Sequence, residues 1–246
     1  MNECYEIKVL DKGHVKYIDH LGSDQRIVDA ARVSYGSSSK GESADKKLLF
    51  YLYKNRHTSP FEQCSISFHI KLPLFVQGQM VRHRTQKLNQ VSARYTEMKE
   101  EFYFPEKWRK QDTKNKQGSL EDSDLSDNPN LVVPHLHDSG HMGENDTNTY
   151  VKELCEYSYN VYKSMLEAGI AKEQARMILP QNLYTVIVST WDLHNLLHFF
   201  SLRLDEHAQW EIREYAKAMF KITEEQFPWT IEAFKKYKLK MIEEIS

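Results

Sequence analysis

The chain has 246 residues, of which 40% are hydrophobic and 28% are charged, and its formal charge is -2. This composition excludes a disordered or fibrous protein, and the near-zero charge argues against bulk electrostatic binding to nucleic acid or anionic lipid. The first residues contain no signal-peptide core, no apolar run approaches the ~18 residues of a membrane span, and the three cysteines form no CxxC pair. We therefore expect a cytoplasmic protein with reduced thiols.

The first hundred residues predict a small antiparallel sheet with helices beside it. Apolar and polar residues alternate around residues 7–9 and 15–17, with the turn signal Asp11-Lys12-Gly13 between them, which indicates a hairpin at a sheet edge. A longer alternating strand is predicted over 65–72. Helices are expected over 24–35 with Ser23 as N-cap, over 46–54, and over 74–83. Gly78 inside the last helix suggests a close approach by another backbone or a ligand.

The second half of the chain is predicted to be mainly helical. Residues 105–147 are polar and charged, and we interpret them as a surface insertion in a single domain that spans 1–246. Helices are predicted over 150–167, 172–179, 190–204, 207–227 and 229–240, with Gly169 ending the first of them. The expected fold class is α+β, with a small antiparallel sheet and a predominantly helical C-terminal half.

The most unusual segment runs from Arg82 to Tyr95. It contains four cationic residues and a histidine, interspersed with Asn, Gln and Ser, and no acidic residue. Arginine side chains match phosphate or carboxylate groups in two-pronged hydrogen bonds, and the amides and hydroxyl add directional contacts. An anion-binding site is therefore favoured over a solvated helix end, in which the helix dipole alone would explain the cations.

Arg82-His83-Arg84, seven further residues and Ser92 resemble the R-H-R-x7-S signature of flavin-dependent thymidylate synthases. Other segments that resemble this family follow in the same order along most of the chain, the insertion excepted: His57–Glu62, Glu101–Tyr103, Ala175–Pro180, Asn182–Thr185, His207–Ile212 and Pro228–Thr230. The resemblance implies methylation of dUMP to dTMP with methylenetetrahydrofolate, FAD and NADPH. It also implies a homotetramer whose active sites are shared between subunits.

The resemblance assigns roles to individual positions. The positions expected to hold dUMP are Gln79, Met80, Val81, Arg82, Gln90, Ser92, Arg94, Arg176 and Arg203. The positions expected near FAD are Ser59, Arg82, His83, Arg84, Gln90, Asp192, His194 and His198. His57 is expected close to flavin and folate. Arg203 is the expected catalytic residue, which polarises the uracil imide.

Elementary chemistry agrees with these implied roles. The dianionic phosphate of dUMP suits charge-assisted hydrogen bonds from Arg94. A guanidinium group beside the imide would stabilise its anion, an effect often worth roughly 3–4 kcal/mol per donor. Ser92 is interpreted as a hydrogen-bond donor to substrate or as a turn cap, since no His/Asp arrangement supports a nucleophile.

The chain departs from the family pattern at several positions. Gln90 stands where many members have Glu, and Lys87 stands where Ser is common. Asp192, His194 and His198 replace the Asn/Arg/Asn set of some members. No GxGxxG motif is present, so FAD is expected to be held by side chains, across an interface between subunits.

Two other functional classes are compatible with parts of the sequence. His194 and His198 share one helix face with His207 near, as in a metal-dependent hydrolase, and 135–141 contains an H-x-H-x3-H cluster. The HExxH base is missing, however. A nucleic-acid-binding module would use Arg82, Arg84, Lys87 and Arg94, with Tyr95 as a stacking platform, but the net charge and the lack of a recognised motif speak against it.

Overall fold

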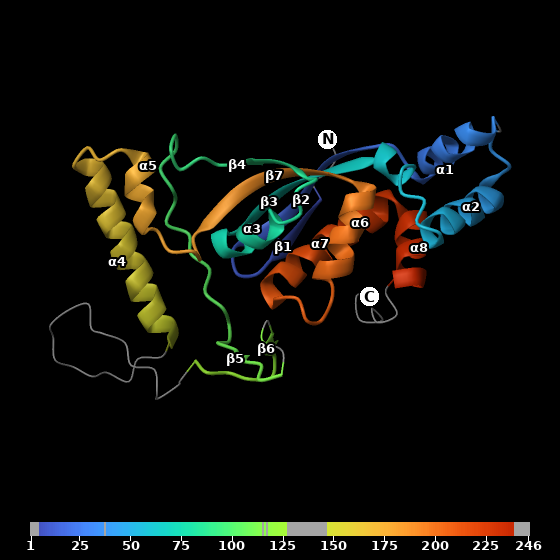
Figure 1. Ribbon diagram of the computed structural model, residues 1–246. Coiled ribbons are helices and arrows are strands. Elements are labelled where there is room, and N and C mark those ends of the chain that lie inside the picture. Colours follow the sequence, from blue (N-terminus) through green and yellow to red (C-terminus); the bar gives the residue numbers. More distant parts are fainter. Residues whose placement is uncertain (1–4, 37, 115, 117, 127–146, 239–246) are drawn as a thin grey trace.

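A five-stranded antiparallel sheet with the order β1-β2-β3-β7-β4 runs through the middle of the molecule (Figure 1). In this computed structural model the described residues are 5–36, 38–114, 116, 118–126 and 147–238. The strands of the sheet are β1 Glu6–Val9, β2 Gly13–Leu21, β3 Ser65–Pro73, β4 Lys87–Gln90 and β7 Tyr184–Asp192. β3 and β7 pair along their whole length, from Ser65 opposite Asp192 to Pro73 opposite Tyr184.

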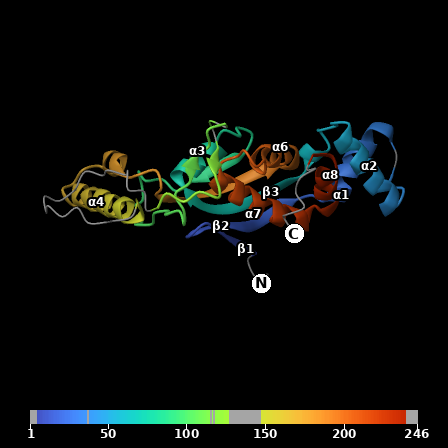
Figure 2. The same ribbon diagram turned by 90° about the horizontal axis from the view of Figure 1, so that it is seen from below.

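Eight α-helices are described around this sheet. They are α1 Asp24–Arg32, α2 Glu42–Lys54, α3 Leu74–Met80, α4 Thr147–Glu167, α5 Lys172–Ala175, α6 Leu193–Arg203, α7 Trp210–Gln226 and α8 Pro228–Lys238. Short 3-10 helices occupy Val33–Tyr35, Phe61–Gln63 and Arg176–Ile178. Figures 1 and 2 show α4 at one end of an elongated molecule and α1 and α2 at the other.

The main core lies between one face of the sheet and α6, α7 and α8. Alternate residues of β3, from Ile66 to Leu72, are fully buried, as their pattern predicts. They pack with aromatic side chains from the helices, including Phe199, Phe200 and Phe220. A separate apolar cluster joins α4 to the start of β7, through Tyr162, Cys155 and Leu183. α4 is therefore attached to the sheet by a small core of its own.

The structure confirms the predicted α+β class and several local features. β1 and β2 form the predicted hairpin at the sheet edge. The Ser23 hydroxyl accepts a hydrogen bond from the Arg26 amide and caps α1. Gly169 adopts a φ of 84° just beyond α4, the left-handed conformation that favours glycine.

The predicted helix over 190–204 is wrong at its start. Residues 184–192 form β7, a strand that lies between β3 and β4 in the sheet. The run Thr185-Val186-Ile187-Val188 is rich in β-branched side chains, and alternate residues are buried on the core face. The β-branched composition was the signal for this strand, and the helical pattern that follows it concealed the boundary at Leu193.

Other element boundaries shift by a few residues. α3 ends at Met80 instead of His83, α5 stops at Ala175 and continues as a 3-10 turn, and α7 begins at Trp210 instead of His207. An added Cβ at Gly78 would meet no described atom within 4 Å, so the expected close approach is not made within the described part of the chain.

The described part of the predicted insertion is attached to α7. It contains a two-stranded ladder, β5 Lys110–Gln111 with β6 Ser119–Leu120. Arg109 forms an ion pair with Glu211, and Glu121 forms one with Arg213. The His135, His137 and His141 cluster lies outside the described residues. In the described ranges, no helix combines the length and the apolar character needed to cross a membrane.

Candidate functional site

A cavity of about 280 Å³ lies between the end of β4, the start of β7 and the 3-10 turn after α5. Gln90, Ser92 and Arg176, three of the residues assigned to dUMP, line it together. β4 pairs with β7, which positions Gln90 opposite Ile187 and brings the segment after β4 beside Thr185. Residues more than 80 positions apart thereby meet around one opening, which we call the anion cavity.

Amide and hydroxyl groups in the anion cavity are ordered by hydrogen bonds. Gln90 Nε2 donates to Thr185 Oγ1 at 3.1 Å, and Gln90 Oε1 accepts from Gln77 Nε2 at 3.1 Å. The Ser92 hydroxyl accepts from the Arg94 amide at 3.3 Å, so Ser92 caps the turn that follows. This turn positions Ser92 in the wall of the anion cavity, and Arg94 follows two residues later.

Two cationic side chains meet at Glu173, next to this cavity. Arg94 Nε lies 3.6 Å from a carboxylate oxygen of Glu173, and Arg176 Nε donates to the Glu173 carbonyl at 3.3 Å. Arg94 is 55% exposed and its guanidinium lies over the Tyr95 ring. A weak exposed ion pair of this kind is easily exchanged for a stronger anion. Sequence reasoning missed Glu173, whose position three residues before Arg176 was the available signal.

A second group of assigned residues lies around His83, outside the lining of the anion cavity. Arg203 Nε, from the last turn of α6, donates to His83 Nε2 at 3.2 Å. Because a guanidinium group only donates, His83 Nε2 is the acceptor and the ring proton resides on Nδ1. The His83 ring also packs against Phe199, Trp191 and His198.

The electrostatics of this second group follow from burial. Burial, with the nearby charges of Arg203 and His198, lowers the pKa of His83 to about 4. Burial also lowers the pKa of Arg203. Among the described residues, no carboxylate lies within 4.0 Å of the Arg203, Arg176, Arg82 or Arg84 guanidinium groups. The half-buried Arg203 is therefore a cation without a carboxylate partner there.

The assigned residues in α3 and just after it have different surroundings; all but Arg84, which is assigned to FAD alone, belong to the dUMP set. Met80 is fully buried in the main core, whereas Val81 is 37% exposed and Arg82 and Arg84 are exposed. Gln79 reaches the start of α7, where its amide nitrogen donates to Gln209 Oε1. Neither Gln79 nor Arg203 is in the lining of the anion cavity of the same chain.

Several residues assigned to FAD line another cavity, of about 260 Å³, between α2 and α6. His57, His194 and His198 face it, with Arg56, Thr58 and Lys238 also in the lining. Ser59 is exposed in the loop that leads to Phe61. Asp192 caps α6, because its carboxylate accepts from the Asn195 backbone at 2.9 Å and from the Asn195 side chain at 2.8 Å. This His57 cavity adjoins the second group through the contact between His83 and His198.

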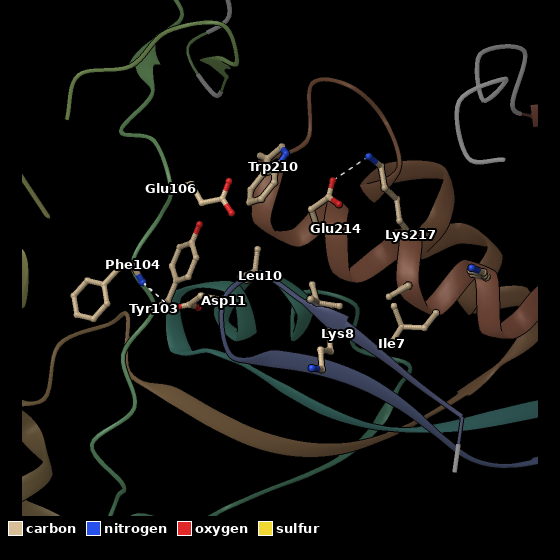
Figure 3. Close-up of a pocket in the computed structure, with 13 residues that line it drawn as sticks. Ile7, Lys8, Leu10, Asp11, Tyr103, Phe104, Glu106, Trp210, Glu214 and Lys217 are labelled. Carbon is tan, nitrogen blue, oxygen red and sulfur yellow. Dashed lines mark hydrogen bonds and ion pairs between the residues drawn. The ribbon is translucent and has the colours of Figure 1, made fainter. Parts of the chain in front are cut away.

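A third cavity, of about 370 Å³, is lined by none of the assigned residues. It lies between the β1–β2 turn and α7, with Tyr103 and Trp210 in its wall (Figure 3). Asp11 accepts from the Tyr184 hydroxyl at 2.5 Å and from the Phe104 amide at 3.4 Å at this place. These bonds join the hairpin to the start of β7.

The described residues do not form the alternative metal site. In these ranges, no group of three or more His, Cys, Asp or Glu side chains is arranged to hold a metal ion. His207 pairs with Asp205 at 2.9 Å, and its side chain is 67% exposed. His194 and His198 line the cavity described above without it.

Comparisons with known proteins agree on one family. Residues 16–229 match the family model described as thymidylate synthase complementing protein. The chain is 44% identical over 233 residues to the flavin-dependent thymidylate synthase of Thermus thermophilus, covering 95% of this chain and 79% of that protein. It is 41% identical over 235 residues to the one from Thermosipho africanus, covering 96% of each.

A solved structure shows the same fold. The UMP/dUMP methylase PolB from Streptomyces cacaoi, bound with 5-Br dUMP, superposes with a TM-score of 0.79 at 30% identity, covering 95% of this chain and 99% of that one. The family model covers most of the chain, and the relatives exceed 40% identity over nearly all of it. This chain belongs to the flavin-dependent thymidylate synthase family.

Proposed function

We propose that this protein methylates dUMP to dTMP, with methylenetetrahydrofolate as carbon donor, FAD as hydride carrier and NADPH as reductant. One observation carries the chemical part of the proposal. Four arginines assigned to the ligands, Arg82, Arg84, Arg176 and Arg203, have no carboxylate partner within 4.0 Å among the described residues. Three other arginines, Arg32, Arg109 and Arg213, are neutralised by carboxylates. Guanidinium groups without a described carboxylate partner, which also include those of Arg26 and Arg56, keep their charge for an anionic ligand such as a nucleotide or a dinucleotide cofactor.

The anion cavity is proposed to receive the phosphate of dUMP. Arg176 and Ser92 line it, and Arg94 lies beside it through Glu173. A phosphate dianion would displace the weak Arg94–Glu173 contact and accept charge-assisted hydrogen bonds from both arginines. Ser92 then donates its hydroxyl proton to the ligand while its oxygen still accepts from the Arg94 amide.

Arg203 is proposed to bind the uracil imide. His83 is neutral near pH 7, because its pKa is about 4. It accepts the hydrogen bond from Arg203 Nε and carries no negative charge that would neutralise the guanidinium group. The terminal nitrogens of Arg203 are left to donate to the imide, where they stabilise negative charge and so raise electron density at the ring carbon that is methylated. A partly buried donor of this kind acts more strongly than an exposed one.

The His57 cavity fits part of FAD. Its lining includes three histidines, Arg56 and Lys238 and no carboxylate, which suits the diphosphate or the polar edge of a flavin. Its volume of about 260 Å³ is below the ~300–1,000 Å³ of sites that enclose a drug-sized ligand, so one chain covers only part of the cofactor. FAD, when bound, supplies the hydride transfer, and the chain positions it through His57, His194 and His198.

We propose that the active site is completed between subunits of a homotetramer. Within one chain, Arg176 and Ser92 belong to the anion cavity, whereas Arg203 and His83 belong to the second group and Gln79 contacts Gln209 at the start of α7. α5 precedes β7 and α6 follows it, so the two groups are carried on segments that leave opposite ends of this strand (Figure 1). A neighbouring subunit that brings its second group to the anion cavity would unite Arg203 and His83 with Arg176 and Ser92.

The test is an absorbance spectrum and a size measurement on the purified protein. We expect bound flavin and a particle of four chains. NADPH oxidation and dTMP formation should require dUMP and methylenetetrahydrofolate together, with reactions lacking either one as controls. A flavin-free protein with stoichiometric zinc, or one that binds oligonucleotides in a steeply salt-dependent way but not dUMP, would contradict the proposal.

A further inference from the structure

Glu211, near the start of α7, is a buried carboxylate that accepts hydrogen bonds from three side chains. It is 4% exposed. Its Oε1 accepts from Arg109 Nη2 at 2.5 Å and from the Tyr103 hydroxyl at 3.3 Å. Its Oε2 accepts from Gln209 Nε2 at 2.8 Å. Burial and the charge of Glu211 raise the pKa of Tyr103, which keeps that phenol protonated as a donor. Glu211 is thus held in one orientation.

A line of hydrogen bonds connects Glu211 to Gln79. Gln209 donates its amide nitrogen to Glu211, and its amide oxygen accepts from the amide nitrogen of Gln79. Gln79 is on α3, 130 positions earlier in the chain, and is one of the residues proposed to bind dUMP. The line therefore runs from a buried ion pair to the proposed nucleotide site.

The direction of these hydrogen bonds is fixed by chemistry. A carboxylate has no proton to give, so Gln209 must present its nitrogen to Glu211 and its oxygen to Gln79. Gln79 must then present its nitrogen to Gln209, which leaves its carbonyl oxygen for another partner. Among the residues that the structure describes, no donor reaches that oxygen. Because Glu211 can only accept hydrogen bonds, it determines, through Gln209, that the carbonyl oxygen of Gln79 and not its amide nitrogen is available to a ligand.

We propose that Glu211, acting through Gln209, is a positioning residue that directs the Gln79 carbonyl oxygen to a hydrogen-bond donor of the bound nucleotide. This inference rests on the proposed function. A phosphate dianion and the uracil carbonyls offer only acceptors. The donors of dUMP are its 3′-hydroxyl and its N3–H, so Gln79 contacts one of these two groups.

The polar segment before α4 takes part in this arrangement. Arg109 comes from that segment, stacks over the Trp210 ring at 5.2 Å and donates to Ser119 Oγ at 2.9 Å. Figure 3 shows Tyr103 and Trp210 facing the same cavity beside the start of α7. The segment thereby neutralises Glu211 and completes the support of Gln79, a role that its polar composition does not reveal.

The inference is tested by calorimetric binding of three nucleotides to the flavin-loaded protein: dUMP, 2′,3′-dideoxyuridine monophosphate, which lacks the 3′-hydroxyl, and N3-methyl-dUMP. The wild-type protein should bind one of the two analogues about three- to tenfold more weakly than dUMP, the size of one neutral hydrogen bond. Because Arg203 is proposed at the imide, N3-methylation can weaken binding there as well, so the analogue whose penalty is lost in Glu211→Gln identifies the donor that Gln79 contacts.

Glu211→Gln is the informative variant. The new amide can donate to Gln209, which allows Gln209 and Gln79 to reverse and present nitrogen to the nucleotide. We expect dUMP affinity to fall about three- to tenfold while the affinity for the penalised analogue stays unchanged, so that discrimination disappears. A purely structural defect would weaken both ligands equally.

Gln209→Met is the second variant, because it removes the connection and leaves the Glu211–Arg109 ion pair intact. It should also reduce discrimination, and it decides the question if Glu211→Gln does not fold. Gln226→Met, the same substitution at the far end of α7, is the matched control and should discriminate like the wild type.

Two results would overturn the inference. One is a folded Glu211→Gln or Gln209→Met protein that binds dUMP and still discriminates fully. The other is a wild-type protein that binds dUMP and both analogues equally. Both results leave the proposed function intact. A wild-type protein that does not bind dUMP would overturn the function and the inference together.

Discussion

The Arg203 guanidinium donates from Nε to Nε2 of His83 at 3.2 Å, across 120 positions of sequence. The bond joins the last turn of α6 to the segment after α3. The bond requires that His83 is neutral, because only an unprotonated Nε2 can accept it. It uses the Nε–H of Arg203, so the two terminal nitrogens of the guanidinium group can donate to a ligand. This pair is the part of the second group on which the proposed catalysis depends most.

Arg203→Ala should reduce kcat sharply. Loss of a preorganised donor to developing charge costs roughly 3–4 kcal/mol, or a few hundredfold in rate. Steady-state turnover with saturating dUMP measures the effect. Arg26→Ala, which removes an exposed arginine of α1, is the matched control and should leave turnover unchanged. Near-normal turnover of Arg203→Ala would show that the imide role is wrong.

Arg94→Ala should mainly weaken dUMP binding. A charge-assisted hydrogen bond contributes about 1.5–3 kcal/mol, so we expect the dissociation constant for dUMP to rise roughly 10- to 100-fold. Deoxyuridine, which has no phosphate, serves as the control ligand and should bind both proteins equally. An equal loss for deoxyuridine would place Arg94 away from the phosphate.

His83 should make stability depend on pH. Its pKa falls from 6.5 to about 4 in the folded protein, so between these values the unfolded chain binds more protons. The free energy of unfolding therefore rises with pH across this window and falls on acidification from pH 6.5 towards 4. Urea unfolding of the wild type and His83→Asn between pH 4 and 7 measures the difference.

The contribution of His83 is the part of the pH slope that His83→Asn removes. Other titrating groups, such as His14, are present in both proteins and cancel in the comparison. Parallel slopes for the two proteins would show that His83 titrates normally in the folded state.

Asp24→Ala should destabilise the fold without touching the proposed site. Asp24 accepts from the Trp229 amide at 2.7 Å, from the Thr230 amide at 3.1 Å and from the Thr230 hydroxyl at 2.6 Å, and it is 6% exposed. Its removal strands these buried donors at the start of α8, which costs about 2–4 kcal/mol of unfolding free energy.

Denaturant unfolding tests the Asp24 prediction. Asp29→Ala, which removes an exposed carboxylate from the same helix, is the control and should change stability by less than about 0.5 kcal/mol. Equal stabilities of the two variants would contradict the capping role.

Local features of the sequence determined much of this protein. The β1–β2 hairpin, the Ser23 cap, the Gly169 helix end and the alternation of β3 each arise within a few residues, because turn chemistry and side-chain periodicity act over that range. The composition of the segment from Arg82 to Tyr95, rich in cations and free of acidic residues, likewise indicates an anion site by itself.

Only the tertiary structure decided how the candidate residues are grouped. The pairing of β7 with both β3 and β4 brings Arg176 to Ser92. The packing of α7 beside α3 brings Gln209 to Gln79, and the end of α6 meets the segment after α3, which brings Arg203 to His83. These partners lie 84 to 130 positions apart, and no periodic pattern encodes such pairs. These pairs form because the apolar faces of the sheet and of the helices pack against each other, and because polar groups that become buried require hydrogen-bond partners.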